Sequence, residues 1–413
     1  MRRMLKHKRI NLYLLISTIL LSALFMGARH ISTALPIFGS NLKDSTDIIH
    51  NYNSVDLNCR LYSVDDSLKN IWIDSLLRAS YKAGRFNGTV LFAENGRIIY
   101  KGYFGYSNIS TKDTLTNHVS LQLASVSKPF TAMAVLLLRY DGKVDIDKDV
   151  KTYIPDFPWD GVTVRHLLNQ RSGLPNYIYA AENFMKDKSL LSNDSLSKLF
   201  TQQNIRLAYK PGLRFQYCNT NYAYLALLVE RVSGMKFAEF MRKRIFEPLK
   251  MNNSFVYDYA EQQDSLPIKG YTGFKKGLME KKPDYLDGVV GDKGLYSTVE
   301  DMFKFDRAMY EERLIPRPML EEAFSPVDMI DETNSRDYGF GWRLKWEIDH
   351  KVVYHNGWWK GYRTYYIHDE QTGKTLIWLN NRSNIRIGDL IAKIMNYPKY
   401  GGYNMVENET GEF

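Results

Sequence analysis

The segment most informative about the fold reads Leu123-Ala-Ser-Val-Ser-Lys-Pro-Phe-Thr-Ala-Met-Ala-Val-Leu-Leu-Leu138. Pro129 fits the first turn of a helix, where a missing N–H is tolerated, and Asp141-Gly142 supplies a stop. Ser125 and Lys128 are three positions apart, so their side chains share one helix face. A buried, neutral lysine amine can take the serine proton and so activate the hydroxyl as a nucleophile. We therefore predict a catalytic site at the start of this helix, where the backbone N–H groups and the helix dipole also favour an oxyanion.

The Ser-x-x-Lys pattern has low specificity on its own. It also occurs at Ser40, Ser195 and Ser233. Those three serines lie in polar stretches or at an expected helix end, where a solvated surface residue is the simpler interpretation. Only Ser125 opens a strongly apolar helix, so the nucleophile is predicted there.

A second pattern, Tyr217-Cys-Asn219, follows a Pro-Gly turn and opens another apolar helix that should end near Ser233-Gly234. A tyrosine can relay protons, and an asparagine amide can hold a substrate amide from either side. The alternative for Tyr217 is helix entry and core packing. Cys218 is best interpreted as a small buried filler.

A third pattern, His355-Asn-Gly357-Trp358, lies on an expected strand. We expect this strand to break at Gly357. Glycine at this position also permits close approach of a ligand to the strand backbone. Trp358 would offer its backbone N–H there and His355 its side chain. Arg363 is a candidate receptor for a substrate carboxylate, with a surface charge as the alternative.

Strands are expected at both ends of the chain and helices in the middle. Two β-rich runs flank Asn95-Gly96, which is a strong hairpin signal, and an amphipathic helix precedes them, marked by Leu68, Ile71, Ile73, Leu76 and Leu77. Further strands are expected at about 340–346, 351–355, 362–368 and 374–380, and a last helix at about 385–396. This order predicts an α+β sandwich: an antiparallel sheet built from both chain ends, flanked by helices, with a mainly helical subdomain.

Composition excludes several classes of protein. With 413 residues, 44% hydrophobic and 24% charged, the chain matches an ordinary globular protein rather than a disordered one. The formal charge is +9, but five of the basic residues lie among the first nine positions, which leaves only +4 for the rest. We therefore expect no nucleic-acid partner.

The basic N-terminus is followed by an apolar run at 12–28, as in an export signal. Its 17 residues suit a cleaved signal peptide or an uncleaved membrane anchor through residues 10–28, and both alternatives stay open. The predicted organisation is a signal or anchor at 1–34, a polar tether at 35–65, a catalytic domain at 66–397 and a polar tail at 398–413. We expect a periplasmic or extracellular location.

No metal or cofactor is expected. The eight histidines and two cysteines show no zinc-binding spacing. Thr372-Gly-Lys-Thr375 faintly resembles a phosphate loop but lacks the required first glycine, and a hairpin turn is the better interpretation. The expected partner is a small-molecule or peptide substrate.

In this order, the three patterns resemble the serine β-lactamase and penicillin-binding-protein superfamily. The match is closest to the branch of class C β-lactamases, D-Ala-D-Ala carboxypeptidases, D-amino-acid peptidases and related esterases, and it spans about 66–396. Secondary landmarks agree: Val162 to Pro175, Gly291 to Asp301, and Tyr338-Gly-Phe-Gly-Trp342.

The resemblance implies a mechanism and a β-lactamase/transpeptidase-like fold. Ser125 would become acylated, Lys128 and Tyr217 would share proton transfer, and Asn219 would position the substrate. The backbone N–H groups of Ser125 and Trp358 would form the oxyanion hole. An exported hydrolase of an amide or ester is expected, acting on a D-amino-acid peptide, a peptidoglycan-related peptide or an ester rather than a β-lactam. The alternative is a penicillin-binding sensor or scaffold of the same fold without turnover.

Three departures from the branch bear on the substrate. His355 stands where many relatives have lysine, so its charge should depend on pH and favour a less anionic substrate. Gln170 stands where histidine is common, and Asp292-Lys293 interrupts a loop that is usually small and glycine-rich. Trp358 and Trp359 are expected to add bulk beside the oxyanion hole.

Overall fold

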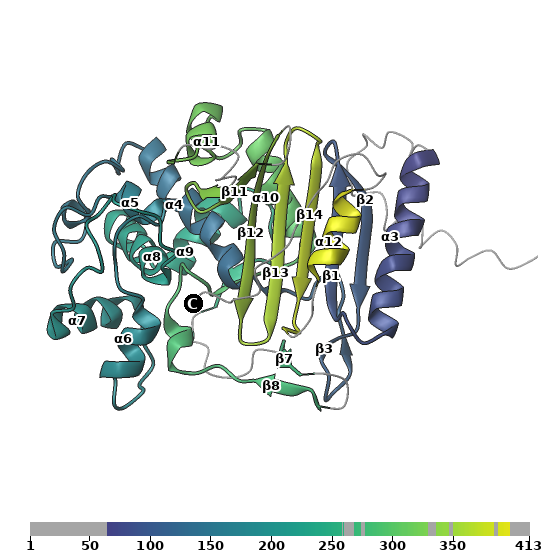
Figure 1. Ribbon diagram of the computed structural model, residues 1–413, viewed down its shortest axis with the longest axis horizontal. Helices are drawn as coiled ribbons and strands as arrows, with labels where there is room; N and C mark the ends of the chain where they lie inside the picture. The colour runs from purple at the N-terminus through teal and green to yellow at the C-terminus, as the bar shows by residue number, and fades with distance from the viewer. Residues whose placement is uncertain are drawn as a thin grey trace, which may run out of the picture. The chain divides into compact units, whose positions relative to one another are not determined.

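Both ends of the described chain meet in one seven-stranded antiparallel sheet (Figure 1). Its order is β10-β11-β12-β13-β14-β1-β2, so the first hairpin pairs with the last strand. The strands are β1 Gly88–Glu94, β2 Arg97–Phe104, β10 Arg336–Tyr338, β11 Arg343–Trp346, β12 Lys351–Trp359, β13 Tyr362–Asp369 and β14 Lys374–Asn380. This arrangement confirms the predicted α+β fold class.

The computed structural model describes residues 64–257, 259, 268–273, 277–328, 336–346, 350–383 and 387–396. The expected export segment and polar tail lie outside these residues, as does the tether except for residues 64 and 65, which already belong to the first helix. Across the described ranges, no helix has both the length and the apolar character that a membrane span needs.

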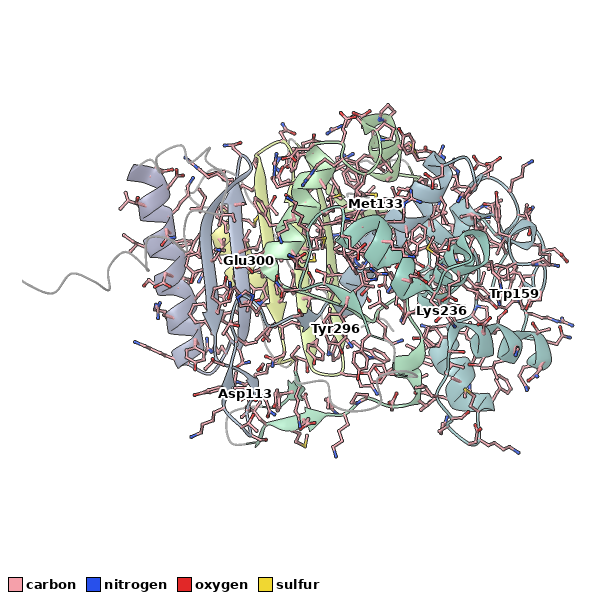
Figure 2. All side chains as sticks on the ribbon, turned by 180° about the vertical axis from the view of Figure 1, so that it is seen from behind. Asp113, Met133, Trp159, Lys236, Tyr296 and Glu300 are labelled. Atoms are coloured by element: carbon pink, nitrogen blue, oxygen red, sulfur yellow. The ribbon has the colours of Figure 1, made fainter. Side chains whose placement is uncertain are left out.

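Helices cover both faces of the sheet. On one face, α3 (Val64–Lys82) and α12 (Gly388–Met395) pack on a cluster that includes Trp378 at the centre of the sheet. On the other face lie α4 (Ser127–Tyr140) and α10 (Val299–Tyr310), whose side chains join the larger core. Glu300 of α10, labelled in Figure 2, accepts a hydrogen bond from Tyr103 of β2, so α10 is tied directly to the sheet. The second of these faces carries the site described below.

A helical subdomain stands beside the sheet (Figure 1). Its central helix, α8, is buried along most of its length, as expected for a helix that is apolar on nearly all sides. The subdomain's helices are α5 Val164–Leu168, α6 Tyr177–Phe184, α7 Asn193–Gln203, α8 Asn219–Ser233 and α9 Phe237–Met241. The remaining elements are α11 Arg317–Ala323 and the short strands β3 Tyr106–Asn108, β4 Asp113–Thr114, β5 Leu121–Gln122, β6 Phe255–Val256, β7 Gly270–Thr272, β8 Met279–Lys281 and β9 Leu295–Ser297.

Two local predictions are wrong. In α3, Leu68 and Ile71 are exposed, whereas Ile73 and Leu77 are fully buried with Lys69 beside them, so the buried stripe is rotated from the expected one. The strand β12 does not break at Gly357 but continues to Trp359, because both sides of the hairpin β12–β13 keep their register to the end. Gly357 therefore does not end the strand; it leaves space on one face of the strand where a side chain would otherwise stand.

Candidate active site

A tight turn presents Ser125 at the start of α4. The short strand β5 ends at Gln122, and a single 3-10 turn over Ala124–Val126 leads into the helix. Ala124 adopts φ +49°, in the left-handed region that a residue with a Cβ rarely occupies. Backbone strain of this kind is common at functional sites, and here it immediately precedes the predicted nucleophile.

Lys128 lies in the first turn of α4 and reaches back to Ser125. Its Nζ is 3.0 Å from Ser125 Oγ and 2.9 Å from the main-chain oxygen of Asp292. The lysine side chain is fully buried, and its Nζ lies 4.9 Å from the centre of the Tyr217 ring. The structure thus brings together the three predicted catalytic residues, Ser125, Lys128 and Tyr217.

Strand β12 contacts the nucleophile through its backbone at Gly357. A Cβ placed on Gly357 would lie 2.9 Å from the amide nitrogen of Ser125 and 2.6 Å from Leu123 O. Thr364, on the neighbouring strand, donates a hydrogen bond to the same Leu123 oxygen at 2.6 Å. The backbone of β12 at Gly357 therefore lies against the backbone at Ser125, a proximity that an oxyanion hole formed by the amides of Ser125 and Trp358 would require. That pairing stays a prediction.

The entry to α8 is fixed by Gln170. The main-chain oxygen of Gln170 accepts from Gln216 N at 2.9 Å, and its side-chain oxygen accepts from Cys218 N at 2.9 Å and from Asn221 Nδ2 at 2.6 Å. Gln170 is fully buried with φ +62°. This departure from the family pattern therefore serves to hold the backbone on both sides of Tyr217.

Tyr217 and Asn219 extend from this entry in ways that suit their predicted roles. The guanidinium of Arg343 lies 4.8 Å from the centre of the Tyr217 ring, so the side chains of Arg343 and Lys128 both lie close to that ring. The side-chain oxygen of Asn219 is buried and has no hydrogen-bond partner among the described residues. An unsatisfied buried acceptor is rare in a native fold, and a substrate N–H is a fitting partner for it.

His355 differs from the expectation of a pH-dependent charge. It is fully buried; its Nε2 accepts from the Tyr338 hydroxyl at 2.9 Å, and its Nδ1–H donates to Asn356 O at 2.8 Å. Burial, together with the charges of Arg343 and Lys128, holds the pKa of His355 well below its ordinary value. The ring is therefore neutral at physiological pH, and with both nitrogens occupied it supports the site rather than offering a free group to a substrate.

Arg363 and the indole of Trp358 lie on the other face of the sheet. Side chains alternate along strands, and Gly357 and Thr364 face Leu123. Their neighbours Trp358 and Arg363, paired across β12 and β13, therefore face away, and Arg363 contacts Tyr365 in the cluster beneath α3 and α12. Arg363 is therefore on the wrong face of the sheet to contact a substrate carboxylate at Ser125. For the same reason, the indole of Trp358 does not add bulk beside the expected oxyanion hole.

Sequence reasoning missed Arg343 and Tyr338 as members of the site. Tyr338 is the first residue of the family landmark Tyr338-Gly-Phe-Gly-Trp342, and Arg343 directly follows that landmark. Their position in or next to the landmark was the signal that could have identified them. Trp359 does face the site, where its ring lies 4.9 Å from Lys293 Nζ and its Nε1 donates to Asp287 at 2.6 Å.

The competing Ser-x-x-Lys patterns lie elsewhere. Ser195 is part of the N-terminal capping box of α7 and is bonded to Ser192. Ser233 ends α8, where its hydroxyl donates to Val229 O at 2.6 Å. Ser40 lies outside the described residues. Neither described serine is bonded to the lysine of its own pattern.

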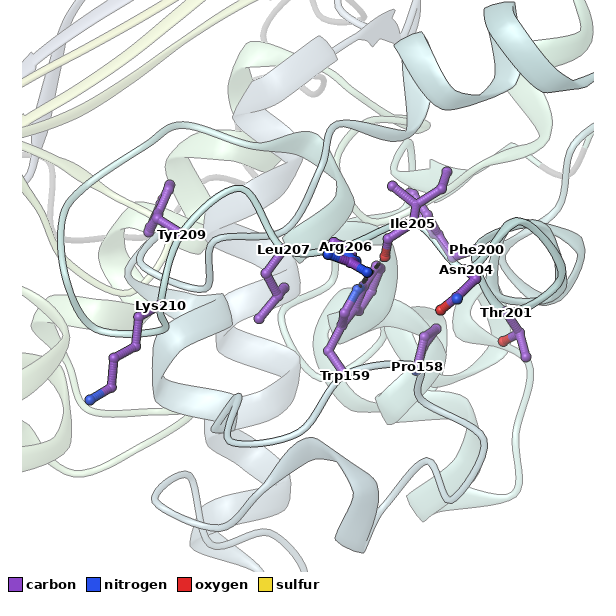
Figure 3. A pocket seen from close by; sticks show the side chains of 10 residues that line it. All are labelled: Pro158, Trp159, Phe200, Thr201, Asn204, Ile205, Arg206, Leu207, Tyr209 and Lys210. Carbon is purple, nitrogen blue, oxygen red and sulfur yellow. Dashed lines mark hydrogen bonds between the residues drawn. The ribbon is translucent and has the colours of Figure 1, made fainter.

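A pocket of about 630 Å³ lies in the helical subdomain, between the end of α7 and the segment that follows it (Figure 3). Trp159, Phe200, Arg206 and Tyr209 are among its lining residues, whereas Ser125, Lys128 and Tyr217 are not. The pocket is therefore separate from the catalytic residues. Within the described ranges, no group of three His, Cys, Asp or Glu side chains could hold a metal ion.

Comparison with known proteins agrees with this geometry. A family model described as Beta-lactamase matches residues 73–389. The chain belongs to the beta-lactamase family. This family member is 36% identical over 312 residues to a penicillin-binding protein of Bacillus subtilis (strain 168), a match that covers 72% of this chain and 68% of that protein.

Solved structures show the same fold as this beta-lactamase family member. A penicillin-binding protein from Bacillus halodurans superposes with a TM-score of 0.69 at 25% identity, covering 78% of this chain and 98% of that one. A D-amino acid amidase from Ochrobactrum anthropi SV3 superposes with a TM-score of 0.64 at 24% identity, covering 76% and 92%. Family membership and site geometry together make the chain a serine hydrolase of the penicillin-binding-protein and β-lactamase type.

Proposed function

We propose that this serine hydrolase is exported and cleaves an amide or ester bond of a small molecule or peptide through an acyl-enzyme at Ser125. The observation that carries the proposal is the 3.0 Å contact between Nζ of the fully buried Lys128 and Oγ of the partly exposed Ser125. Few structural roles explain a buried lysine whose closest partners are a hydroxyl and a main-chain carbonyl.

Acylation follows from this geometry. Ser125 Oγ attacks the substrate carbonyl carbon while the amine of Lys128, 3.0 Å away, takes the hydroxyl proton. The carbonyl oxygen becomes an oxyanion, which the backbone N–H groups of Ser125 and Trp358 stabilise. When the intermediate collapses, the bond to the leaving amine or alcohol breaks, and that group takes a proton through Lys128 or Tyr217.

Deacylation reverses the same proton path. A water molecule attacks the acyl carbon and gives a proton to Tyr217, which passes its own phenol proton to Lys128; Ser125 Oγ leaves and regains a proton from Lys128. Lys128 Nζ and the Arg343 guanidinium lie 4.9 Å and 4.8 Å from the centre of the Tyr217 ring, and the positive charge of Arg343 would stabilise negative charge on the phenol oxygen during this transfer. Asn219, with its buried acceptor oxygen, would hold the substrate amide.

The substrate class follows from charge. His355 is neutral, so the position on β12 where many relatives have lysine carries no positive charge, and the Arg343 guanidinium lies 4.8 Å from the centre of the Tyr217 ring. D-amino-acid peptides and amides fit this arrangement, in line with the names of the Bacillus penicillin-binding protein and of the D-amino acid amidase fold neighbour. A β-lactam is the less favoured substrate.

Labelling of the active serine tests the proposal. A fluorescent fluorophosphonate should label the wild-type chain but not Ser125→Ala, whereas Ser195→Ala and Ser233→Ala serve as matched controls and should label normally. Equal labelling of Ser125→Ala would overturn the site.

Turnover separates the hydrolase from the sensor. Among p-nitrophenyl esters and D-Ala-D-Ala peptides with and without a free carboxylate, at least one substrate should give steady-state turnover with the wild-type chain, and nitrocefin should be hydrolysed more slowly because a β-lactam is the less favoured substrate. A single burst followed by no turnover would identify a non-turnover penicillin-binding sensor instead.

A further inference from the structure

A buried cluster adjoins Lys128 through the main-chain oxygen of Asp292, which accepts a hydrogen bond from Lys128 Nζ. Asp292 and Lys293 are 2% and 3% exposed. The Tyr177 hydroxyl, from α6, lies 3.0 Å from Asp292 Oδ2 and 2.6 Å from Lys293 Nζ. Burial raises the pKa of Tyr177 well above its ordinary value, so the hydroxyl keeps its proton: it donates to Asp292 and accepts from Lys293.

The loop that contains Asp292 and Lys293 has a glycine on each side of this pair. Gly291 and Gly294 flank the pair with φ values of +99° and +94°, a region in which glycine alone moves without strain. Between them lies the peptide group whose oxygen accepts from Lys128 Nζ at 2.9 Å. A rotation of that peptide group would remove one of the two hydrogen-bond partners that direct the amine.

The side chains of the pair oppose such a rotation. Lys293 Nζ donates to Val289 O at 3.0 Å in addition to Tyr177, and its ammonium lies 4.9 Å from the Trp359 ring. Asp292 and Lys293 are thus anchored on both sides of the peptide group by α6, by the preceding loop and by β12. Burial of an ion pair is a poor source of stability, so a positional role explains the cluster better than a stabilising one.

We infer that Lys293, with Tyr177 and Asp292, is a positioning residue that fixes the Asp292 carbonyl and thereby holds the Lys128 amine against Ser125. This inference rests on the proposed function, because it concerns the base of the acylation step. Lys293 touches no reacting atom and acts only through the loop.

The test measures the rate of fluorophosphonate labelling and the kcat and KM for a p-nitrophenyl ester. Lys293→Met leaves Asp292 without its cation and is expected to be unstable, so the decisive variant is the double change Asp292→Asn with Lys293→Met, which removes both charges. It should melt near the wild-type temperature, reach full labelling at long times, and label about 10- to 100-fold more slowly, with kcat reduced and KM unchanged.

Tyr177→Phe provides an independent measurement, since it removes only the shared hydroxyl, and it should lower kcat in the same direction. Lys188→Met is the matched control: Lys188 also lies over a tyrosine ring, at 4.7 Å from that of Tyr285, and bonds its hydroxyl at 3.2 Å. It should label at the wild-type rate.

The outcomes are distinct. Wild-type labelling rates in the folded double variant overturn the positioning role, as do wild-type rates in Tyr177→Phe when the double variant does not fold. Labelling of Ser125→Ala overturns the proposed function itself, whatever the Lys293 variants do.

Discussion

Gly357 and Ser125 are in backbone contact: a Cβ on Gly357 would lie 2.9 Å from the amide nitrogen of Ser125. The same Cβ would meet Thr364 Oγ1 at 2.4 Å and Leu123 O at 2.6 Å. Two of these three atoms belong to the backbone and cannot move aside independently. The distance between β12 and the nucleophile is therefore set by the absence of a side chain at one position.

Gly357→Ala should consequently impair acylation. The strand must move away from the turn at Ser125, which opens the paired amides and lowers the labelling rate about 100-fold. Overpacking should also lower the free energy of unfolding by about 1–3 kcal/mol. Fluorophosphonate labelling and chemical denaturation measure the two effects.

Gly277→Ala is the control for this change. Nothing lies within 4 Å of a Cβ at Gly277, so both labelling and stability should stay at wild-type values. A wild-type labelling rate in Gly357→Ala would show that the contact does not set the site's geometry.

His355 should make the fold sensitive to acid. Its pKa in the folded state lies well below the ordinary value of 6.5 because of burial and of the charges of Arg343 and Lys128. Below pH 6.5 the unfolded chain binds a proton that the folded chain does not, so stability present above pH 6.5 is lost as the pH falls. The loss approaches about 1.4 kcal/mol per pH unit until the folded pKa is reached.

The comparison with His355→Gln isolates this contribution. Denaturation at pH 7.5, 6.0 and 5.0 should show the wild type losing more stability than the variant over the lower two values, with the other acid-sensitive groups common to both. Parallel losses in the two proteins would mean that His355 is charged in the fold.

The sheet was predictable because its signals are local. Asn95 and Gly96 both take positive φ, as the hairpin turn requires, and the last strand Lys374–Asn380 has the expected bounds. The nucleophile helix was predictable for a similar reason, since Ser125, Lys128 and the stop at Asp141 lie within one continuous apolar pattern.

The sequence predictions were wrong for residues whose orientation or charge is determined by tertiary contacts. The face of Arg363 depends on which residue of β12 touches Ser125, and only the register of the sheet settles that. The neutrality of His355 depends on complete burial and on the nearby charges of Arg343 and Lys128. Asp292 and Lys293 looked like an intrusion because their partner, Tyr177, lies more than a hundred residues earlier in the chain.

Asn219 and Asn221 should separate binding from stability. The oxygen of Asn219 has no partner among the described residues, so Asn219→Ala removes no internal hydrogen bond from it. If this oxygen receives the substrate N–H, kcat/KM for a D-peptide should fall about 10-fold or more, with the melting temperature nearly unchanged.

Asn221→Ala should behave in the opposite way. Asn221 donates to Gln170 Oε1 at 2.6 Å and accepts from the Ser172 hydroxyl, so its loss removes two buried hydrogen bonds, leaves the Ser172 hydroxyl without its acceptor and lowers stability by about 1–3 kcal/mol. A stable Asn221→Ala chain, or an unstable Asn219→Ala chain, would contradict this division of roles.

Lys128→Met should abolish acylation without destabilising the fold. Methionine keeps the length and volume of the side chain, so the fully buried site stays filled, and the desolvation penalty of a buried amine disappears. The melting temperature should therefore hold or rise, whereas labelling should slow about 100- to 10,000-fold through loss of the base.

Lys236→Met is the matched control, because Lys236 ends the Ser233-x-x-Lys pattern at the far end of α8 and should have no effect on labelling. A destabilised but still rapidly labelled Lys128→Met chain would mean that Lys128 is structural and that another group takes the Ser125 proton. A stable and inactive chain is expected, because functional sites commonly hold groups that the fold alone would not select.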